Sequence, residues 1–353
     1  MKTAFAILLT ILSLLPTLPA QKSYPTGPSH QQQEGGLAFE LNVPATKEND
    51  PRPGMIVVLH GAGGTATGMA GALAFMAPKG YVVVAPKSTG QVWTPGDVEK
   101  VRELVRDLER DLRVDHERLH AVGFSNGGWN LPLLAFDEKM HFLSATFVAS
   151  GWQGRRPPKK ARKRMGILAL VGSEDGNRPH ALQIPKLLGK SVRRAEVRVQ
   201  PGLGHAWPRK LMPFFAWWIE ALEGRCQPGV DMNFEWITDL DAARATMVQE
   251  KRKGMIYFYS REEEDGDLTR KLQCETFFDP RVRFYGAQLV PILLDIAEHP
   301  DLREAFRLKE GPAIVLLDQH FKEPKVLPGK VSASKLAKAL RRRARKKIMP
   351  KGR

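Results

Sequence analysis

Short apolar runs alternate with amphipathic helical stretches between residues 37 and 224. Several runs are apolar at nearly every position, which is typical of parallel strands buried on both faces of a sheet. Asp97–Arg113 places apolar residues at spacings of three and four, and the aromatic-rich Pro208–Glu223 is expected to be the closing helix. The predicted strands are Leu37–Val43, Met55–Leu59, Tyr81–Ala85, Leu119–Phe124, Ser144–Ala149, Gly166–Val171 and Ala195–Gln200. This alternation predicts an α/β domain with a doubly wound, mostly parallel sheet.

A second, smaller cycle of helices and strands follows a segment rich in turn-forming residues. Residues 225–232 contain proline and glycine and are expected to be a linker. The predicted elements beyond it are helix Leu240–Lys253, strand Met255–Tyr259, helix Asp267–Phe277, strand Val290–Asp295, a short helix near Leu302–Phe306, strand Ala313–Leu317 and a helix from Ser332. They predict a second α/β domain over residues 233–344, followed by a basic tail of residues 345–353.

The N-terminus has the pattern of a cleavable export signal over residues 1–20. Lys2 supplies a positive start, Ala4–Leu15 is an apolar run too short to span a bilayer, and Ala20 is a small residue suited to cleavage. A polar lead of residues 21–36 follows. We therefore expect a secreted or periplasmic protein without a transmembrane helix.

The strongest chemical signal is Gly123-Phe-Ser-Asn-Gly127, which follows a predicted strand and precedes a helix. A serine on so sharp a strand-to-helix turn needs small neighbours on both sides, and the turn exposes its Oγ at the carboxyl edge of the sheet. Ser125 is therefore the predicted nucleophile.

A serine hydroxyl needs a base to take its proton, and the base needs a carboxylate to orient it. In hydrolases with such a turn, the chain order is Ser, acid, His. Asp175 follows one later strand and His205 follows the next, so they are the predicted acid and base. Glu174, beside Asp175, is a rival for the acid.

The turn His60-Gly-Ala-Gly-Gly64 follows a buried strand and predicts an oxyanion site. The backbone N–H of Ala62 is the expected first donor, and the N–H of Asn126, directly after the nucleophile, is the expected second donor. The same glycines fit a relaxed dinucleotide-binding fingerprint, but that reading needs an acid at the end of the next strand. Tyr81–Lys87 ends without one.

Together these motifs resemble the α/β-hydrolase esterases of the polyhydroxybutyrate-depolymerase and feruloyl-esterase type. The resemblance rests on HGAGG, Trp93, GFSNGG, GSEDG and GLGHAWP, and it covers roughly residues 37–224. It implies a triad of Ser125, Asp175 and His205 and substrates that are carboxylic esters. The chain departs from the family between Gly151 and Met165, where relatives insert a lid, so the site is expected to be open.

Several aromatic and histidine residues lie near these motifs. Trp93 and Trp207 are predicted to line an aromatic substrate pocket. His116 and His120 are four apart, but no third ligand is in view, so surface histidines are expected rather than a metal site. No cofactor and no metal is predicted.

The second predicted domain resembles a thioredoxin-like domain. Met255–Ser260 followed by a helix, and Pro312 at the position of the family's cis-proline, carry this resemblance. The position of the family's CxxC is Ser260–Asp265, which lacks cysteine, so a redox-inactive binding or stabilising module is implied. Cys226 and Cys274 are the only cysteines, and an oxidising compartment would allow them to pair, which the sequence leaves open.

Composition and charge narrow the picture further. With 353 residues, 42% of them hydrophobic, the chain is not mainly disordered or collagen-like. Its formal net charge of +16 comes from two runs without acids, Arg155–Arg164 and Lys335–Arg353. We expect a solvated tail, and we hypothesise that the first run lies beside the active site and favours anionic substrates. Contact with an anionic surface through both runs is the alternative, and nucleic acid is not expected.

The sequence therefore predicts an exported serine hydrolase that cleaves small or polymeric carboxylic esters through an acyl-enzyme. The alternative is a non-catalytic binding protein on a hydrolase scaffold. The ordered Ser, Asp and His favour the enzyme.

Overall fold

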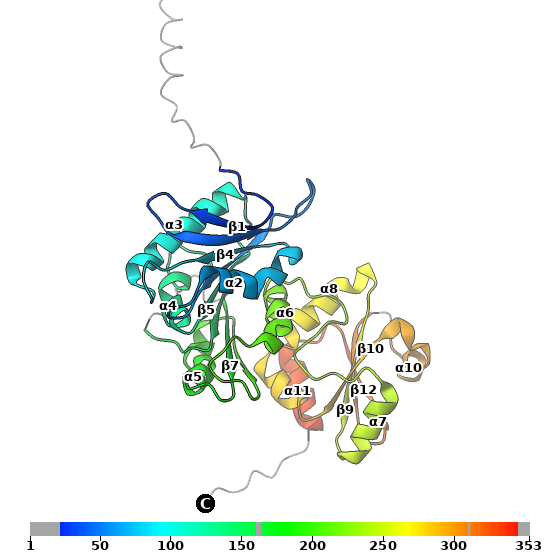
Figure 1. Ribbon diagram of the computed structural model, residues 1–353. Helices are drawn as coiled ribbons and strands as arrows, with labels where there is room; N and C mark the ends of the chain where they lie inside the picture. Colours follow the sequence, from blue (N-terminus) through cyan, green and yellow to red (C-terminus); the bar gives the residue numbers. More distant parts are fainter. Residues whose placement is uncertain (1–21, 155, 158, 160–163, 310, 345–353) are drawn as a thin grey trace, which may run out of the picture. The chain divides into compact units, whose positions relative to one another are not determined.

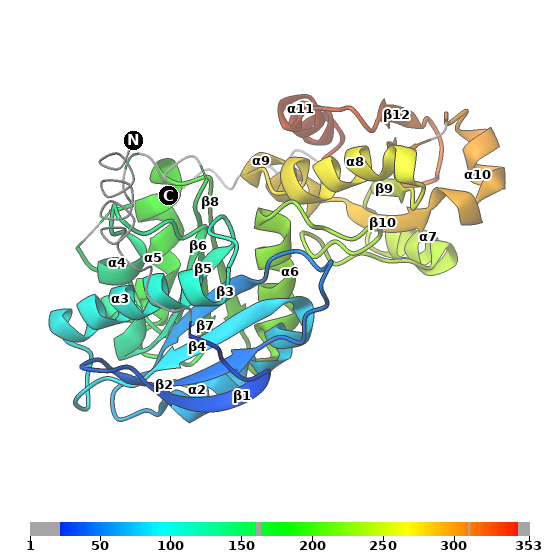
Figure 2. The same ribbon diagram turned by 90° about the horizontal axis from the view of Figure 1, so that it is seen from above.

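The computed structural model describes residues 22–154, 156, 157, 159, 164–309 and 311–344 (Figures 1 and 2). The predicted export signal, the basic tail and most of Arg155–Arg164 lie outside the described residues. The structure divides into two compact units. The first holds the described residues up to Phe142 together with Gln153 and Gly154, and the second holds the others from Leu143 onward.

Eight strands form one sheet in the order β1-β2-β4-β3-β5-β6-β7-β8. The pairs β3/β4, β3/β5, β6/β7 and β7/β8 are parallel, while β2 runs antiparallel to both β1 and β4. This mixed sheet has the strand order of the α/β-hydrolase fold. The predicted strands are thus confirmed within one or two residues at their ends.

The first unit consists of five strands and their connecting helices. Its elements are β1 (Gly27–Gln32), β2 (Ala38–Val43), β3 (Gly54–Leu59), α2 (Ala66–Leu73), a 3₁₀ helix (Ala74–Lys79), β4 (Tyr81–Pro86), α3 (Pro95–Asp111), β5 (Leu119–Phe124) and α4 (Asn126–Ala135). The helices α3 and α4 pack together, and Figure 2 shows α2 on the other face of this part of the sheet. The connections β3–α2–β4 and β4–α3–β5 run in opposite directions along the sheet. Because both are right-handed crossovers, α2 and α3 lie on opposite faces.

The second unit begins with β6 (Ser144–Val148), β7 (Gly166–Gly172), α5 (Arg178–Leu188), β8 (Arg194–Gln200) and α6 (Met212–Leu222). Its further elements are α7 (Leu240–Gln249), β9 (Gly254–Tyr259), α8 (Glu263–Lys271), a π-helical turn (Leu272–Thr276), α9 (Pro280–Gly286), β10 (Val290–Asp295), α10 (Pro300–Ala305), β11 (Ala313–Leu317), β12 (Lys325–Pro328) and α11 (Ala333–Arg343).

A four-stranded sheet in the order β10-β9-β11-β12 forms the second sheet of this unit (Figure 1). Alternate side chains of β9 belong to two different hydrophobic cores, one on each face of the sheet. Met255 and Tyr257 pack against the side of α9 and α11, whereas Ile256 and Phe258 pack against the side of α7 and α10. The helix predicted over Asp267–Phe277 begins earlier, at Glu263, and ends in the π-helical turn.

The four-stranded region is fixed to α6 and to the edge strand β8. Cys226 and Cys274 form a disulfide, which settles the pairing that the sequence left open. Phe278 stacks on Trp217 with ring centroids 4.8 Å apart, and the Arg194 guanidinium lies 3.3 Å from the Phe278 centroid. Strand β8 lies at the edge of its sheet, where backbone N–H and C=O groups have no neighbouring strand. The contact between Arg194 and Phe278 helps to cover this edge.

The structure adds a first strand that the sequence did not predict, and it contradicts one expectation. The polar lead contains β1, a strand whose sequence has no apolar pattern. It pairs with β2 along its whole length, so pairing with β2, rather than the side chains of β1, specifies this strand. His120 is not a surface histidine, because it lies within β5, which is buried on both faces, and its ring packs at 5.9 Å from Tyr81. His116 is exposed, as expected.

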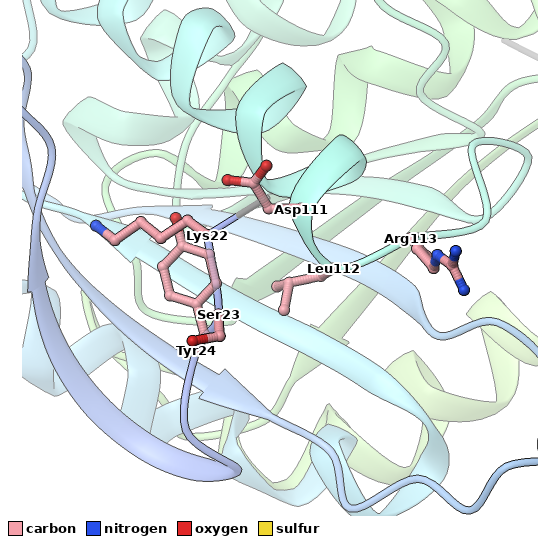
Figure 3. A pocket seen from close by; sticks show the side chains of 6 residues that line it. All are labelled: Lys22, Ser23, Tyr24, Asp111, Leu112 and Arg113. Carbon is pink, nitrogen blue, oxygen red and sulfur yellow. The ribbon is translucent and has the colours of Figure 1, made fainter. Parts of the chain in front are cut away.

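The start of the described chain packs against the end of α3. Lys22, Ser23 and Tyr24 line a pocket with Asp111, Leu112 and Arg113 (Figure 3). Burial, together with the charge of Asp111, raises the pKa of the Tyr24 hydroxyl. None of these six residues belongs to the predicted site. Within the described ranges, every helix is too short or too polar to cross a membrane.

Candidate active site

Ser125 lies between β5 and α4 in a backbone conformation that L-residues rarely adopt. Its φ is 49° and its ψ is −115°. Such a conformation costs on the order of 1–3 kcal/mol, and persists only where the surrounding structure enforces it. Strain of this kind at a serine between a strand and a helix is the hallmark of a nucleophile turn.

The flanking glycines of the motif are both required by close packing. A Cβ on Gly123 would lie 2.5 Å from the carbonyl oxygen of Gly127, and a Cβ on Gly127 would lie 2.5 Å from that of Leu59. Real Cβ atoms do not approach backbone oxygens so closely. The small residues that the sequence pattern demanded therefore have a steric reason in the structure.

The glycine-rich turn after β3 lies directly against the Ser125 turn. A Cβ on Gly61 would be 2.9 Å from the Phe124 ring and 3.2 Å from the Cβ of Ser125. The neighbouring Ala62 is exposed. Asn126 is the first residue of α4, and the first N–H groups of a helix have no partner within it. The structure thus brings Ser125, the Ala62 turn and Asn126 together in the first unit.

Asp175 and His205 meet in the second unit. The Nδ1 atom of His205 lies 3.1 Å from Oδ1 and 3.2 Å from Oδ2 of Asp175. Because a carboxylate only accepts, Nδ1 carries the hydrogen and Nε2 is the basic nitrogen. The side chain of Asp175 is 1% exposed, whereas that of His205 is 45% exposed. Glu174, the rival acid, is exposed to solvent.

Further hydrogen bonds orient the Asp175 carboxylate. Its Oδ1 accepts from the backbone N–H of Asn177 at 2.8 Å, and the Asn177 amide in turn donates to the carbonyl of Ala149 at 2.8 Å. A carboxylate held in this way keeps the imidazole in one tautomer and one orientation.

The two tryptophans predicted to line a pocket have different environments. Trp93 is 4% exposed, and its indole N–H donates to the carbonyl of His60 at 2.8 Å. Its backbone N–H donates to the Asn126 side chain at 2.9 Å. Trp93 therefore supports the turns of the site from within, while Trp207 is half-buried two residues beyond His205.

His60 has a role that the sequence pattern did not indicate: it is fully buried and directly follows β3. Ser88, which hydrogen-bonds to it, was also missed. The available signal was a histidine directly before the glycine-rich turn, but its partner on the loop after β4 becomes apparent only in the structure.

Comparisons with known proteins point to esterases over part of the chain. No family model matches the chain. It is 29% identical over 154 residues to the protein described as "Putative esterase NocK" of Nocardia uniformis subsp. tsuyamanensis, covering 39% of this chain and 43% of that protein. The chain thus spans less than half the length of this relative.

Two solved structures are similar to part of the chain. An arylesterase is 13% identical with a TM-score of 0.46, and the match covers 62% of this chain and 90% of that one. The carboxylesterase of Bacillus cereus is 13% identical with a TM-score of 0.42, covering 53% of this chain and 94% of that one. The sequence identity is low in both matches.

Proposed function

We propose that the protein is a serine hydrolase that cleaves carboxylic esters, with Ser125 as nucleophile, His205 as base and Asp175 as the orienting acid. The observation that carries this proposal is the strained Ser125 turn, packed against a glycine-rich loop. The hydrogen-bonded pair Asp175 and His205 supports it. Asp175 and His205 follow β7 and β8, which are parallel neighbours, and the carboxyl ends of parallel strands share an edge.

The chemistry proceeds in two acyl transfers. His205 Nε2 takes the proton from Ser125 Oγ, which attacks the ester carbonyl and forms a tetrahedral oxyanion. The backbone N–H groups of Ala62 and Asn126 donate to this oxyanion. His205 then protonates the leaving alcohol, and water, activated by the same imidazole, releases the acyl group as a carboxylic acid and restores Ser125. The scheme requires no cofactor.

The finer assignment is an exported enzyme of the polyhydroxybutyrate-depolymerase or feruloyl-esterase type. It rests on the HGAGG, GFSNGG and GHAWP motifs and on the pattern of residues 1–20. Trp93 and Trp207 would then border the site for the acyl or alcohol group. The basic run Arg155–Arg164 connects β6 to β7, which supports a preference for anionic esters.

For the four-stranded region we propose a thioredoxin-like, redox-inactive module. The order β10-β9-β11-β12, with β9 and β10 parallel and β11 antiparallel to β9, supports this proposal. Ser260 directly follows β9, at the position where a redox thiol would be expected. One feature differs, since the Gly311–Pro312 bond is trans, like every peptide bond among the described residues. The trans form is the intrinsically favoured isomer of such bonds.

The decisive experiment is hydrolysis of p-nitrophenyl acetate by the mature protein and by Ser125→Ala. Loss of a triad nucleophile lowers kcat by about 10⁶-fold in a serine hydrolase. Labelling of Ser125 by a fluorophosphonate, absent in Ser125→Ala, provides a second readout. Turnover that persists in the variant contradicts the proposal. A folded wild-type protein that neither turns over esters nor reacts with the probe favours the non-catalytic binding scaffold.

A further inference from the structure

His60 is a fully buried imidazole whose partners determine its protonation state. Nδ1 lies 2.7 Å from the carbonyl oxygen of Gly61, and Nε2 lies 3.1 Å from the backbone nitrogen of Ser88. A carbonyl only accepts and a backbone N–H only donates, so Nδ1 must carry the hydrogen and Nε2 must be bare. His60 is thus a neutral imidazole that joins the glycine-rich turn to the loop after β4.

A second connection runs from His60 to the first residue of α4. The Trp93 indole donates to the carbonyl of His60 at 2.8 Å, and the two rings lie 4.8 Å apart. The backbone N–H of Trp93 donates to Oδ1 of Asn126 at 2.9 Å. The turn that carries Ala62 and the residue Asn126 are therefore linked through His60 and Trp93.

The loop that carries Ser88 and Trp93 is itself fixed. The Ser88 hydroxyl donates to the carbonyl of Gly90 at 2.7 Å. Asp97, in the first turn of α3, accepts hydrogen bonds from the backbone and hydroxyl groups of both Thr89 and Thr94. Thr94 and Asp97 form a capping box, which anchors the loop to the helix. The partners of His60 therefore have a defined position.

We infer that His60 is a positioning residue of the oxyanion site, which holds the Ala62 and Asn126 donors at a constant separation. This inference rests on the proposed function. Backbone donors stabilise an oxyanion only when they already point to the place where its charge develops. Burial, with a contribution from the nearby Lys87 charge, lowers the pKa of His60, which agrees with the neutral form required by its partners.

The test compares His60→Asn and Trp93→Phe with the wild-type protein. The asparagine amide can still donate near Gly61 but is too short to reach Ser88, and phenylalanine keeps the ring while losing the bond to the His60 carbonyl. We expect kcat for p-nitrophenyl acetate to fall about 10- to 100-fold, less than the 10²–10³-fold cost of deleting a whole donor, with KM nearly unchanged. His116→Asn, at an exposed histidine of the same unit, is the matched control.

Inhibitor binding separates positioning from a merely structural role. A trifluoromethyl ketone, which forms a tetrahedral adduct with Ser125, should lose affinity in parallel with kcat/KM, while binding of the carboxylate product stays constant. Variants with lower melting temperatures but wild-type kcat and inhibitor affinity would overturn the inference. If His60→Asn does not fold, Trp93→Phe provides the same test. Activity that survives Ser125→Ala would instead overturn the proposed function.

Discussion

Gly172 and Leu203 approach each other so closely that a Cβ on residue 172 would lie 1.9 Å from the Leu203 carbonyl oxygen. The contact joins the end of β7 to the loop after β8. Two hydrogen bonds reinforce it, from Glu174 N–H to the Leu203 carbonyl at 2.9 Å and from Gly202 N–H to the Ser173 hydroxyl at 2.8 Å. The same two segments carry Asp175 and His205, so this contact determines their separation.

Gly172→Ala should therefore impair the enzyme strongly. The added methyl group has backbone on its far side, so the loop must move, and His205 moves with it. A displacement of about 1 Å at a catalytic group can cost about 100-fold in rate, and we expect a loss of kcat at least that large. Ester hydrolysis and thermal melting should be measured together. Gly176→Ala is the control, because a Cβ there meets nothing within 4 Å; equal activity of both variants would contradict the prediction.

The adjacent acids Glu174 and Asp175 should behave very differently when each is changed to its amide. Asp175→Asn presents an N–H where His205 needs an acceptor, which favours the wrong tautomer and should lower kcat by about 10⁴-fold. Glu174→Gln alters an exposed side chain and should leave kcat close to that of the wild type. The kcat of both variants is measured by p-nitrophenol release. A comparable loss of kcat in the two variants would show that Glu174 shares with Asp175 the role of orienting His205.

The Cys226–Cys274 disulfide should contribute substantially to stability. It closes a loop between cysteines 48 positions apart, and loop-closure entropy for such a length amounts to about 4 kcal/mol at most. The double variant Cys226→Ser, Cys274→Ser should show a lower free energy of unfolding in urea. Reduction of the wild-type protein with dithiothreitol should produce a similar decrease and leave the double variant unchanged. A double variant as stable as the oxidised wild type would contradict this expectation.

Asp231 should make stability depend on pH. Burial raises the pKa of its carboxyl from 3.8 to about 6, although Asn233 and Trp236 donate hydrogen bonds to it. Between these values the folded state binds more protons than the unfolded state, so the contribution of Asp231 to stability falls as pH rises from about 4 to 6.

Asp231→Asn removes this titration. Its free energy of unfolding, relative to that of the wild type, should rise across the same pH window, with a slope of up to about 1.4 kcal/mol per pH unit. Urea melts at several pH values between 4 and 7 measure this difference. Parallel curves for the two proteins would show that Asp231 titrates alike in the folded and unfolded states.

Much of the architecture follows from local pattern. The buried strands have continuous apolar runs, and β5, β10 and β11 have the predicted bounds. The strands β1 and β12 were missed because they lie at sheet edges, alternate between partly buried and exposed residues, and are specified by pairing with β2 and β11. An edge strand of this kind has little side-chain signal of its own.

The sequence by itself indicated the Ser125 turn, because both glycines of its motif lie two positions from the serine. The Leu59 backbone that Gly127 packs against, however, is brought there by the tertiary structure. The tertiary structure decided which of two adjacent acids contacts His205, how His60 connects two separate loops, and that Cys226 pairs with Cys274. These relationships join segments separated by 28 to 48 positions. Their geometry depends on how strands and loops pack against one another, which no local pattern of residues specifies.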